Sequence, residues 1–100
     1  MVKHVILWTL RENCFGAEIG QIKSGIKEGL EGLLGEIPGL VDIKVTTECL
    51  PSSNADIMLD STFESEEALK AYAIHPKHVA VANEKVRPFT ETRTCIDYII

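Results

Sequence analysis

Three side chains that could take part in chemistry lie within the segment "YAIHPKHVAV", residues 72–81: Tyr72, His75 and His78. A histidine titrates near neutral pH and can act as a general base, and a tyrosine hydroxyl can donate a hydrogen bond to a developing oxyanion. Removal of a proton next to a carbonyl needs both groups. The segment therefore predicts either a polar site or only the break between two helices, because the residue before a proline favours a helix boundary.

Two residues near the N-terminus are candidates for the same site. His4 and Trp8 are four positions apart, so they share one face of the first predicted strand. If this face points toward the helices, both side chains line the cavity that holds Tyr72 and His78. Tyr72 and His78 thus offer a donor and a base, and His4, Trp8 and His75 are candidate ligand-binding residues.

Each candidate also has a purely structural interpretation. His75 can cap the helix that follows it, and His78 can hold the loop through a hydrogen bond. Tyr72 can be a half-buried core residue with its hydroxyl paired, and His4 can be a hydrogen-bonded histidine of the sheet. Trp8 can belong to the core or to the wall of a cavity. The sequence leaves both interpretations open for all five residues.

No metal or other cofactor is predicted. His75 and His78 are three apart, which suits ligands on a continuous helix, but Pro76 disturbs that register and no third ligand is obvious. The sequence has no phosphate-binding loop and no Ser-His-Asp arrangement with supportive spacing. Its cysteines are widely spaced and lack a CxxC motif, so neither a zinc site nor a disulfide framework is indicated. We expect reduced thiols at Cys14, Cys49 and Cys95.

The composition fits one globular domain over residues 1–100, with 45% apolar and 25% charged residues. The formal net charge of −5 argues against binding to nucleic acid or to an anionic membrane, both of which favour a basic surface. No apolar run approaches the ~20 residues of a membrane-spanning helix. The apolar N-terminal stretch is too short and too alternating for a signal peptide, so we expect a cytoplasmic protein.

The apolar periodicity changes along the chain between the patterns of strands and helices. Alternation with period two predicts strands over residues 2–11, 40–47, 55–63 and 90–100. Apolar residues at steps of three and four predict helices over residues 17–34, from the N-cap Ser65 to about 73, and 76–86. The turn-rich residues 49–54 predict a long, mobile loop that joins the second and third strands as an antiparallel hairpin.

Three glycines lie inside the first predicted helix, at Gly25, Gly29 and Gly32. Each costs roughly 1 kcal/mol relative to alanine. We expect them to allow close approach of this helix to the sheet. Gly35 is expected to adopt the left-handed conformation that ends the helix, with Pro38 shortly after it.

The order β-α-β-β-α-β predicts an α+β ferredoxin-like sandwich, with a four-stranded antiparallel sheet and helices on one face. Both faces of the strands carry apolar residues, so the uncovered face would expose them to water. A second copy packed on this face about a two-fold axis would cover it. The sequence therefore predicts a homodimer in the form of a dimeric α/β barrel.

Four segments resemble the stress-responsive dimeric α/β-barrel family, often called Dabb. They are "MVKHVILWTL" at the start, "IPGLVDIKV" at 37–45, "STFESEEALKAYAIHPKHVAV" at 61–81 and "RPF" at 87–89. The HPxH segment is the most specific part, and the resemblance covers nearly the whole chain. It implies a ferredoxin-like subunit that packs on its twin, and a cavity between sheet and helices.

More distantly, the chain is similar to olivetolic acid cyclase, which closes an aromatic ring by aldol chemistry. The likeness implies that Tyr72 and His78 are the catalytic pair, with His4 and His75 nearby. One position departs from the pattern, because Ile57 stands where the cyclase has a further pocket histidine.

Three classes of function follow from these observations. The first is a homodimer, stress-associated in the family sense, that binds a small apolar or aromatic molecule in the sheet-helix cavity. The alternative is a cofactor-independent, polyketide-cyclase-like enzyme with His78 as general base and Tyr72 as hydrogen-bond donor. The third is an interaction module whose dimer interface is its whole role. Fold and family alone license no activity.

Overall fold

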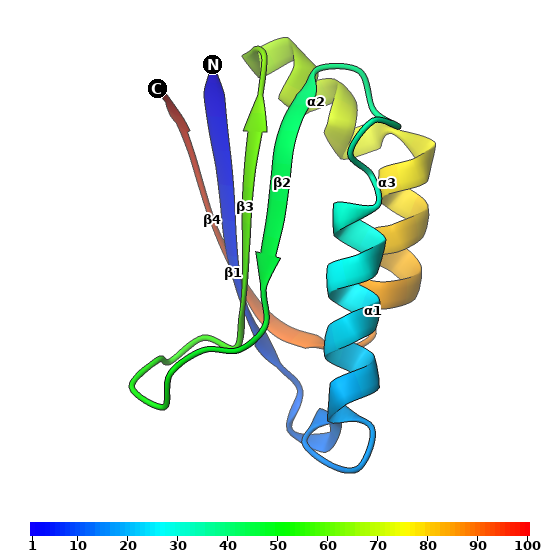
Figure 1. Cartoon of the computed structure of the whole chain (residues 1–100), viewed down its shortest axis with the longest axis vertical. Coiled ribbons are helices and arrows are strands. Elements are labelled where there is room, and N and C mark those ends of the chain that lie inside the picture. The colour runs from blue at the N-terminus through cyan, green and yellow to red at the C-terminus, as the bar shows by residue number, and fades with distance from the viewer.

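The sheet positions every other part of the molecule. In the computed structural model, which describes residues 1–100, it has four strands: β1 (Val2–Leu10), β2 (Leu40–Thr46), β3 (Ile57–Phe63) and β4 (Thr90–Ile99). Their spatial order is β2-β3-β1-β4, and every neighbouring pair is antiparallel. All helices lie on one face of this sheet (Figure 1). The predicted ferredoxin-like α+β plan is confirmed.

The helical layer consists of α1 (Ile19–Glu31), α2 (Glu66–Ile74) and α3 (Pro76–Val81), with a 3-10 turn at Glu12–Cys14 and a π-helical turn at Ala82–Val86. The 3-10 turn was not predicted, because three residues are too few to show a periodicity. The π-helical turn continues α3, so the predicted helix over 76–86 changes its hydrogen-bond step partway. No helix combines the length and the apolar composition needed to cross a bilayer.

The break between α2 and α3 lies where the sequence predicts it. The Ser65 hydroxyl accepts a hydrogen bond from the Ala68 amide at 3.1 Å and so caps α2. His75 has extended backbone dihedrals, φ −66° and ψ 131°, and Pro76 then opens α3 at its first position. The two helices therefore meet at an angle that the proline fixes, and this angle sets how Tyr72 and His78 face each other.

The core lies between the sheet and the helices. Alternate residues of β1 and β3 point into it, and Ile57, Phe63 and Ile26 are fully buried there. The strand β3 begins at Ile57, two residues later than predicted. Asp56 instead braces β1, because its carboxylate accepts a hydrogen bond from the Leu10 amide at 2.8 Å.

The glycines of α1 do not serve the contact that we expected. A Cβ atom at Gly29 would lie 3.0 Å from Cγ1 of Val81, and one at Gly25 would lie 3.6 Å from the Lys85 side chain. These positions face α3 and the π-helical turn, so the close approach is between helices and the expected approach to the sheet is wrong. Gly35 has the predicted left-handed conformation, with φ +85°. It does not end the helix, however, because α1 already stops at Glu31 with Gly32 as its C-cap, three residues earlier than predicted.

The other face of the sheet, which we call the open sheet face, carries no helix (Figure 1). Leu7, Ile96 and Tyr98 lie on it, and 39%, 59% and 44% of their surfaces are exposed. Beside this apolar strip, Lys3 forms an ion pair with Asp60 at 2.7 Å. The open sheet face is therefore a mixed surface with an apolar strip across β1 and β4.

Candidate functional site

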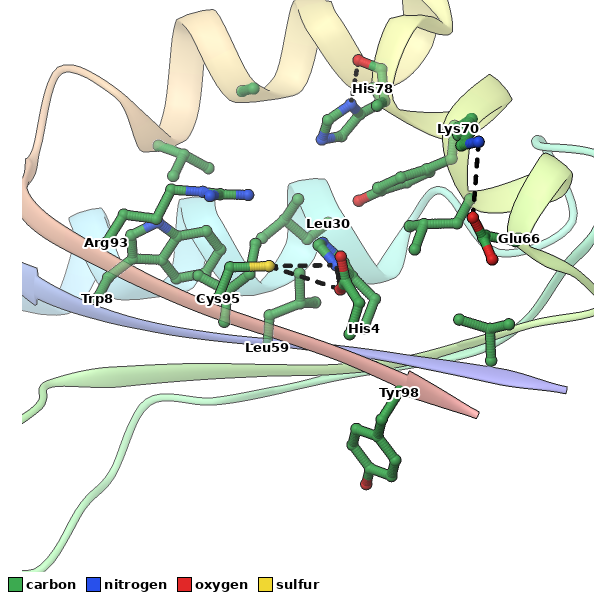
Figure 2. A pocket seen from close by; sticks show the side chains of 18 of the residues that line it. His4, Trp8, Leu30, Leu59, Glu66, Lys70, His78, Arg93, Cys95 and Tyr98 are labelled. Atoms are coloured by element: carbon green, nitrogen blue, oxygen red, sulfur yellow. Dashed lines mark hydrogen bonds and ion pairs between the residues drawn. The ribbon is translucent and has the colours of Figure 1, made fainter. Parts of the chain in front are cut away.

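A cavity of about 980 Å³ lies between the sheet and the helices. It is lined by 21 residues, of which 13 are hydrophobic, so a ligand that fills it would be largely apolar. Its remaining lining residues are polar or charged and come from β1, the α2–α3 region, Arg87 after the π-helical turn, and β4. In Figure 2 the side chains of His4, His78, Arg93 and Cys95 point into the space between sheet and helices. Tyr98 borders the cavity, but its ring extends to the other side of β4.

Tyr72 lies on α2 and is 1% exposed. Its ring stacks on that of His78, with 4.0 Å between centroids and 29° between planes, and meets the edge of His4 at 6.2 Å. Its hydroxyl is buried and contacts no hydrogen-bond partner within the chain. Burial raises the pKa of this hydroxyl well above its ordinary value, against a weaker opposing effect of the Arg93 charge, so it remains a donor at neutral pH.

His78 on α3 has one ring nitrogen engaged. Its Nδ1 lies 3.4 Å from the carbonyl oxygen of Ala73. Since a carbonyl only accepts, Nδ1 carries the proton in this contact and Nε2 keeps its lone pair. Burial lowers the pKa of His78, and the positive charge of Arg87 acts in the same direction, so the ring is a neutral base at pH 7.

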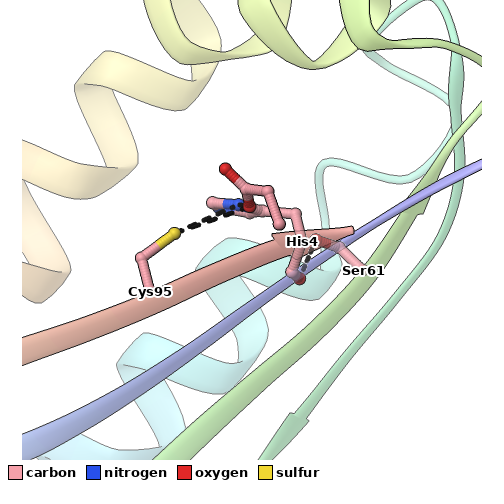
Figure 3. A network of polar contacts seen from close by, with 4 residues as sticks. His4, Ser61 and Cys95 are labelled. Carbon is pink, nitrogen blue, oxygen red and sulfur yellow. Dashed lines mark hydrogen bonds and ion pairs between the residues drawn. The ribbon is translucent and has the colours of Figure 1, made fainter. Parts of the chain in front are cut away.

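His4 on β1 is the centre of a third polar group. Its Nδ1 lies 2.5 Å from Oδ1 of Asp97 and 3.7 Å from Sγ of Cys95 (Figure 3). The Ser61 hydroxyl donates to the His4 carbonyl at 2.8 Å and fixes the strand there. Burial, and then the neighbouring Asp97 carboxylate, raise the pKa of the Cys95 thiol.

The sequence analysis missed Cys95 and Asp97 as parts of the site. Both line the cavity, and the register of β1 with β4 places His4 opposite Asp97 and Ile6 opposite Cys95. The signal that could have found them is the alternation of the last strand, which puts these two residues on one face. Only the pairing of β4 with β1 shows that this face looks toward His4.

Four of the five candidate residues come together, since His4, Trp8, Tyr72 and His78 all line the cavity. His75 does not line it. Its Nδ1 accepts a hydrogen bond from the Lys77 amide at 3.1 Å, which caps α3. The structural interpretation of His75 therefore holds, and its candidate role in ligand binding finds no support in the geometry.

These groups allow two kinds of use. The apolar wall with an unpaired donor can hold a molecule that carries a hydrogen-bond acceptor. The neutral His78 beside the Tyr72 hydroxyl also provides a base and a donor for proton transfer.

Comparison with known proteins agrees with this architecture. A stress-response A/B barrel domain-containing protein from Arabidopsis thaliana, DABB1, is 32% identical over 102 residues, which include 99% of this chain and 47% of that protein. The chain thus spans about half the length of this curated relative.

Solved structures share the fold over nearly the whole chain. A protein from Bacteroides fragilis, described as dimeric, ferredoxin-like and of unknown function, is 32% identical with a TM-score of 0.90, covering 99% of this chain and 95% of that one. Hydroxynitrile lyase from Passiflora edulis is 21% identical with a TM-score of 0.74, covering 99% of this chain and 92% of the lyase. At that identity the likeness to the lyase shows the fold alone.

The sequence pattern, the observed fold and these relatives agree with one another. Residues 2–100 match the family described as the Stress responsive A/B Barrel Domain. The chain therefore belongs to the Dabb family of stress-responsive A/B barrel proteins.

Proposed function

We propose that this Dabb protein acts as a homodimer that binds a small apolar or aromatic molecule in the sheet-helix cavity, one ligand per chain. The observation that carries the proposal is the buried Tyr72 hydroxyl, which lines an apolar cavity and has no partner in the protein. A buried polar group without a partner costs about 1–3 kcal/mol. A ligand with a carbonyl oxygen would accept its hydrogen bond and remove that cost.

Trp8 provides a direct measurement, because it is the only tryptophan of the chain and lines the cavity. We would titrate the protein with 2-acetylnaphthalene and with 2-ethylnaphthalene, which have similar shapes but differ in the carbonyl, and follow the quenching of Trp8 fluorescence. We expect the ketone to bind more tightly by roughly tenfold, the worth of one hydrogen bond of about 1.4 kcal/mol.

The variant Tyr72→Phe should lose this preference and bind the two compounds equally. Tyr98→Phe is the matched control, since Tyr98 is the only other tyrosine and its ring and hydroxyl extend to the other side of β4 in Figure 2. If the ketone keeps its advantage in Tyr72→Phe, the hydroxyl is not the recognition group. If neither compound quenches Trp8, the proposal of a ligand cavity is wrong.

A second candidate function is catalysis without a cofactor, as in a polyketide-cyclase-like aldol closure. The observation that favours it is the free Nε2 of His78 beside the stacked Tyr72 ring. Nε2 would remove a proton next to a carbonyl, and the Tyr72 hydroxyl would donate to the resulting enolate oxygen. The substrate class is a linear poly-β-keto thioester. Its enolate carbon would attack a second carbonyl to form the ring bond, His78 would return the proton to the new alkoxide, and loss of water would give the aromatic ring.

Ring closure of such a thioester can be followed by the ultraviolet absorbance of the aromatic product. We expect His78→Ala to abolish turnover without changing the oligomeric state. Because the pKa of His78 is lowered, the rate in the wild-type protein should be level near neutral pH and fall only on the acid side of the ordinary histidine range. Equal turnover in His78→Ala would exclude this residue as the base.

The homodimer is proposed to form through the open sheet face. The apolar strip of Leu7, Ile96 and Tyr98 supports this placement, because a monomer would leave it in water. The Bacteroides fragilis relative is itself described as dimeric. The cavity lies between the sheet and the helices, on the opposite side of the sheet, so pairing through the open sheet face would not fill it.

A further inference from the structure

Three side chains with different metal-binding atoms converge on the floor of the cavity. They are His4 of β1 with Cys95 and Asp97 of β4, and their nitrogen, sulfur and oxygen atoms all lie within 4.8 Å of one another. We propose that these residues form a site for a divalent transition metal, with zinc as the ion that the ligand set fits best. This site is distinct from the His75–His78 pair that the sequence analysis considered and set aside.

The distances between the three atoms are close to those that zinc requires. Around a tetrahedral zinc ion, with bonds of about 2.0 Å to nitrogen and oxygen and about 2.3 Å to sulfur, the ligand atoms lie about 3.3–3.5 Å apart. Here His4 Nδ1 is 3.7 Å from Cys95 Sγ, and Sγ is 3.5 Å from Asp97 Oδ1. Two edges of the triangle therefore need almost no adjustment.

The third edge joins His4 Nδ1 to Asp97 Oδ1 and measures 2.5 Å, because a proton lies between the two atoms. A metal would replace that proton, and the edge would have to open by about 0.8 Å to reach the tetrahedral value. The Asp97 side chain is 45% exposed, so it can turn to do this. His4 is held in place by its burial and by the hydrogen bond from Ser61 to its backbone.

The chemistry of the ligand set selects among metals. A thiolate, an imidazole and a carboxylate together suit zinc, whereas magnesium and calcium prefer oxygen ligands alone. Three protein ligands that also line a cavity leave a coordination position for a ligand or water, as in zinc sites that act as Lewis acids. The residues that the structure brings together would thus add an electrophilic centre to a cavity that Tyr72, His78 and Arg93 also line.

Cobalt(II) gives the sharpest test, because it occupies zinc sites and a bound thiolate produces a charge-transfer band in the near ultraviolet. The protein of residues 1–100 would first be dialysed against a chelator and then titrated with Co²⁺, followed by displacement with Zn²⁺. We expect one ion per chain, a charge-transfer band, and loss of that band when zinc is added. Zinc should also protect Cys95 from alkylation by iodoacetamide, while Cys49 still reacts.

Variants of single residues test whether Cys95 and Asp97 bind the metal. Cys95→Ser should abolish the charge-transfer band and weaken binding by more than the roughly 10–100-fold that loss of an outer contact costs. Asp97→Asn should weaken binding and keep the band. Cys49→Ser is the control, because Cys49 is an exposed cysteine that lies outside the cavity, and it should leave the band and the affinity unchanged.

Two results would overturn the proposal. One is a protein that binds no Co²⁺ or Zn²⁺ at micromolar concentrations, and the other is a Cys95→Ser variant that binds as well as the parent. Both mutated residues are exposed in the chain, so the variants should stay folded, and the melting temperature would verify this. The naphthalene titrations in chelator-treated protein test the ligand cavity separately, so failure of one proposal is distinguishable from failure of the other.

Discussion

At Tyr72 the protein buries a hydroxyl that none of its own groups contacts. Packing alone would be served equally well by phenylalanine, since the ring already contacts His78 and Phe63. Natural proteins accept such a cost at functional sites, where activity and stability compete. The unpaired hydroxyl is therefore the strongest single sign that the cavity is used.

This interpretation predicts that Tyr72→Phe stabilises the free protein. Removal of the unpaired hydroxyl should raise the free energy of unfolding by about 1 kcal/mol, because the ring contacts remain and the desolvation cost disappears. Urea unfolding, followed by circular dichroism, would measure the change. The control Tyr98→Phe removes a hydroxyl from a side chain that is 44% exposed in the chain, so it should give no such gain. A loss of stability in Tyr72→Phe would mean that its hydroxyl is paired in solution.

His78 should make stability depend on pH. Its pKa is lowered in the folded protein from the ordinary value of 6.5, so below that pH the unfolded chain takes up a proton at this position that the folded chain resists. Stability from this residue is therefore full above the unfolded pKa and is lost as the pH falls toward the folded one. His78→Phe keeps an aromatic ring and should flatten the unfolding free energy between about pH 7 and pH 5. An unchanged pH profile would show that the ring is solvated.

The sequence predicted those cavity residues whose titratable side chains lie close together in one short segment. Tyr72 and His78 are recognisable because they flank Pro76. Cys95 and Asp97 were not found, because their partner His4 lies more than 90 positions away in the sequence. Contact between these side chains depends on which strands are neighbours in the sheet. The alternation of residues along one strand does not show which strand lies beside it.

At the scale of the elements, the contact between α1 and α3 depends on the absence of one side chain. A Cβ atom at Gly29 would lie 3.0 Å from Val81, closer than nearly all such contacts, whereas one at Gly25 would meet only a flexible lysine at 3.6 Å. The interface is therefore tight at one turn of α1 and tolerant at the turn before it.

Alanine substitutions at these two glycines should change the free energy of unfolding in opposite directions. Gly25→Ala should stabilise the protein by up to ~1 kcal/mol, because alanine is the better helix former. Gly29→Ala gains the same propensity but forces α1 away from Val81, so we expect it to be less stable than Gly25→Ala by about 1–3 kcal/mol. Chemical denaturation of both variants would compare them directly. Equal stabilities would mean that α1 shifts without cost.

Type and order of the main elements were predictable, because each strand and helix has a clear period and marked ends. Ser65, Pro76 and Gly35 act through local backbone chemistry, so their roles could be read from the sequence. The sequence did not show which element packs against the glycines of α1. A small residue indicates that another segment can approach closely, but it does not identify that segment. The start of β3 was misplaced because Asp56 contacts β1 and does not pair with β2.

At the scale of the whole molecule, the apolar strip of the open sheet face predicts dissociation when a charge enters it. Ile96→Lys should weaken the homodimer by at least roughly tenfold, because a lysine would be desolvated at the interface. Ile74→Lys is the matched control, since Ile74 is 79% exposed on α2, away from the sheet. Sedimentation velocity at micromolar concentration would distinguish an 11.1 kDa species from its pair. A parent protein that sediments as a single chain would contradict the pairing.

The two ends of the described chain lie side by side (Figure 1), and the amide of Ile100 donates a hydrogen bond to the carbonyl of Met1 at 3.0 Å. A short peptide could therefore fuse them without disturbing the sheet. New ends could then be opened in the connection at residues 49–54, far from the cavity. Such a circular permutant would keep its ligand chemistry while reducing the sequence separation of β1 and β4, which would show whether early contact between these two strands limits the rate of folding.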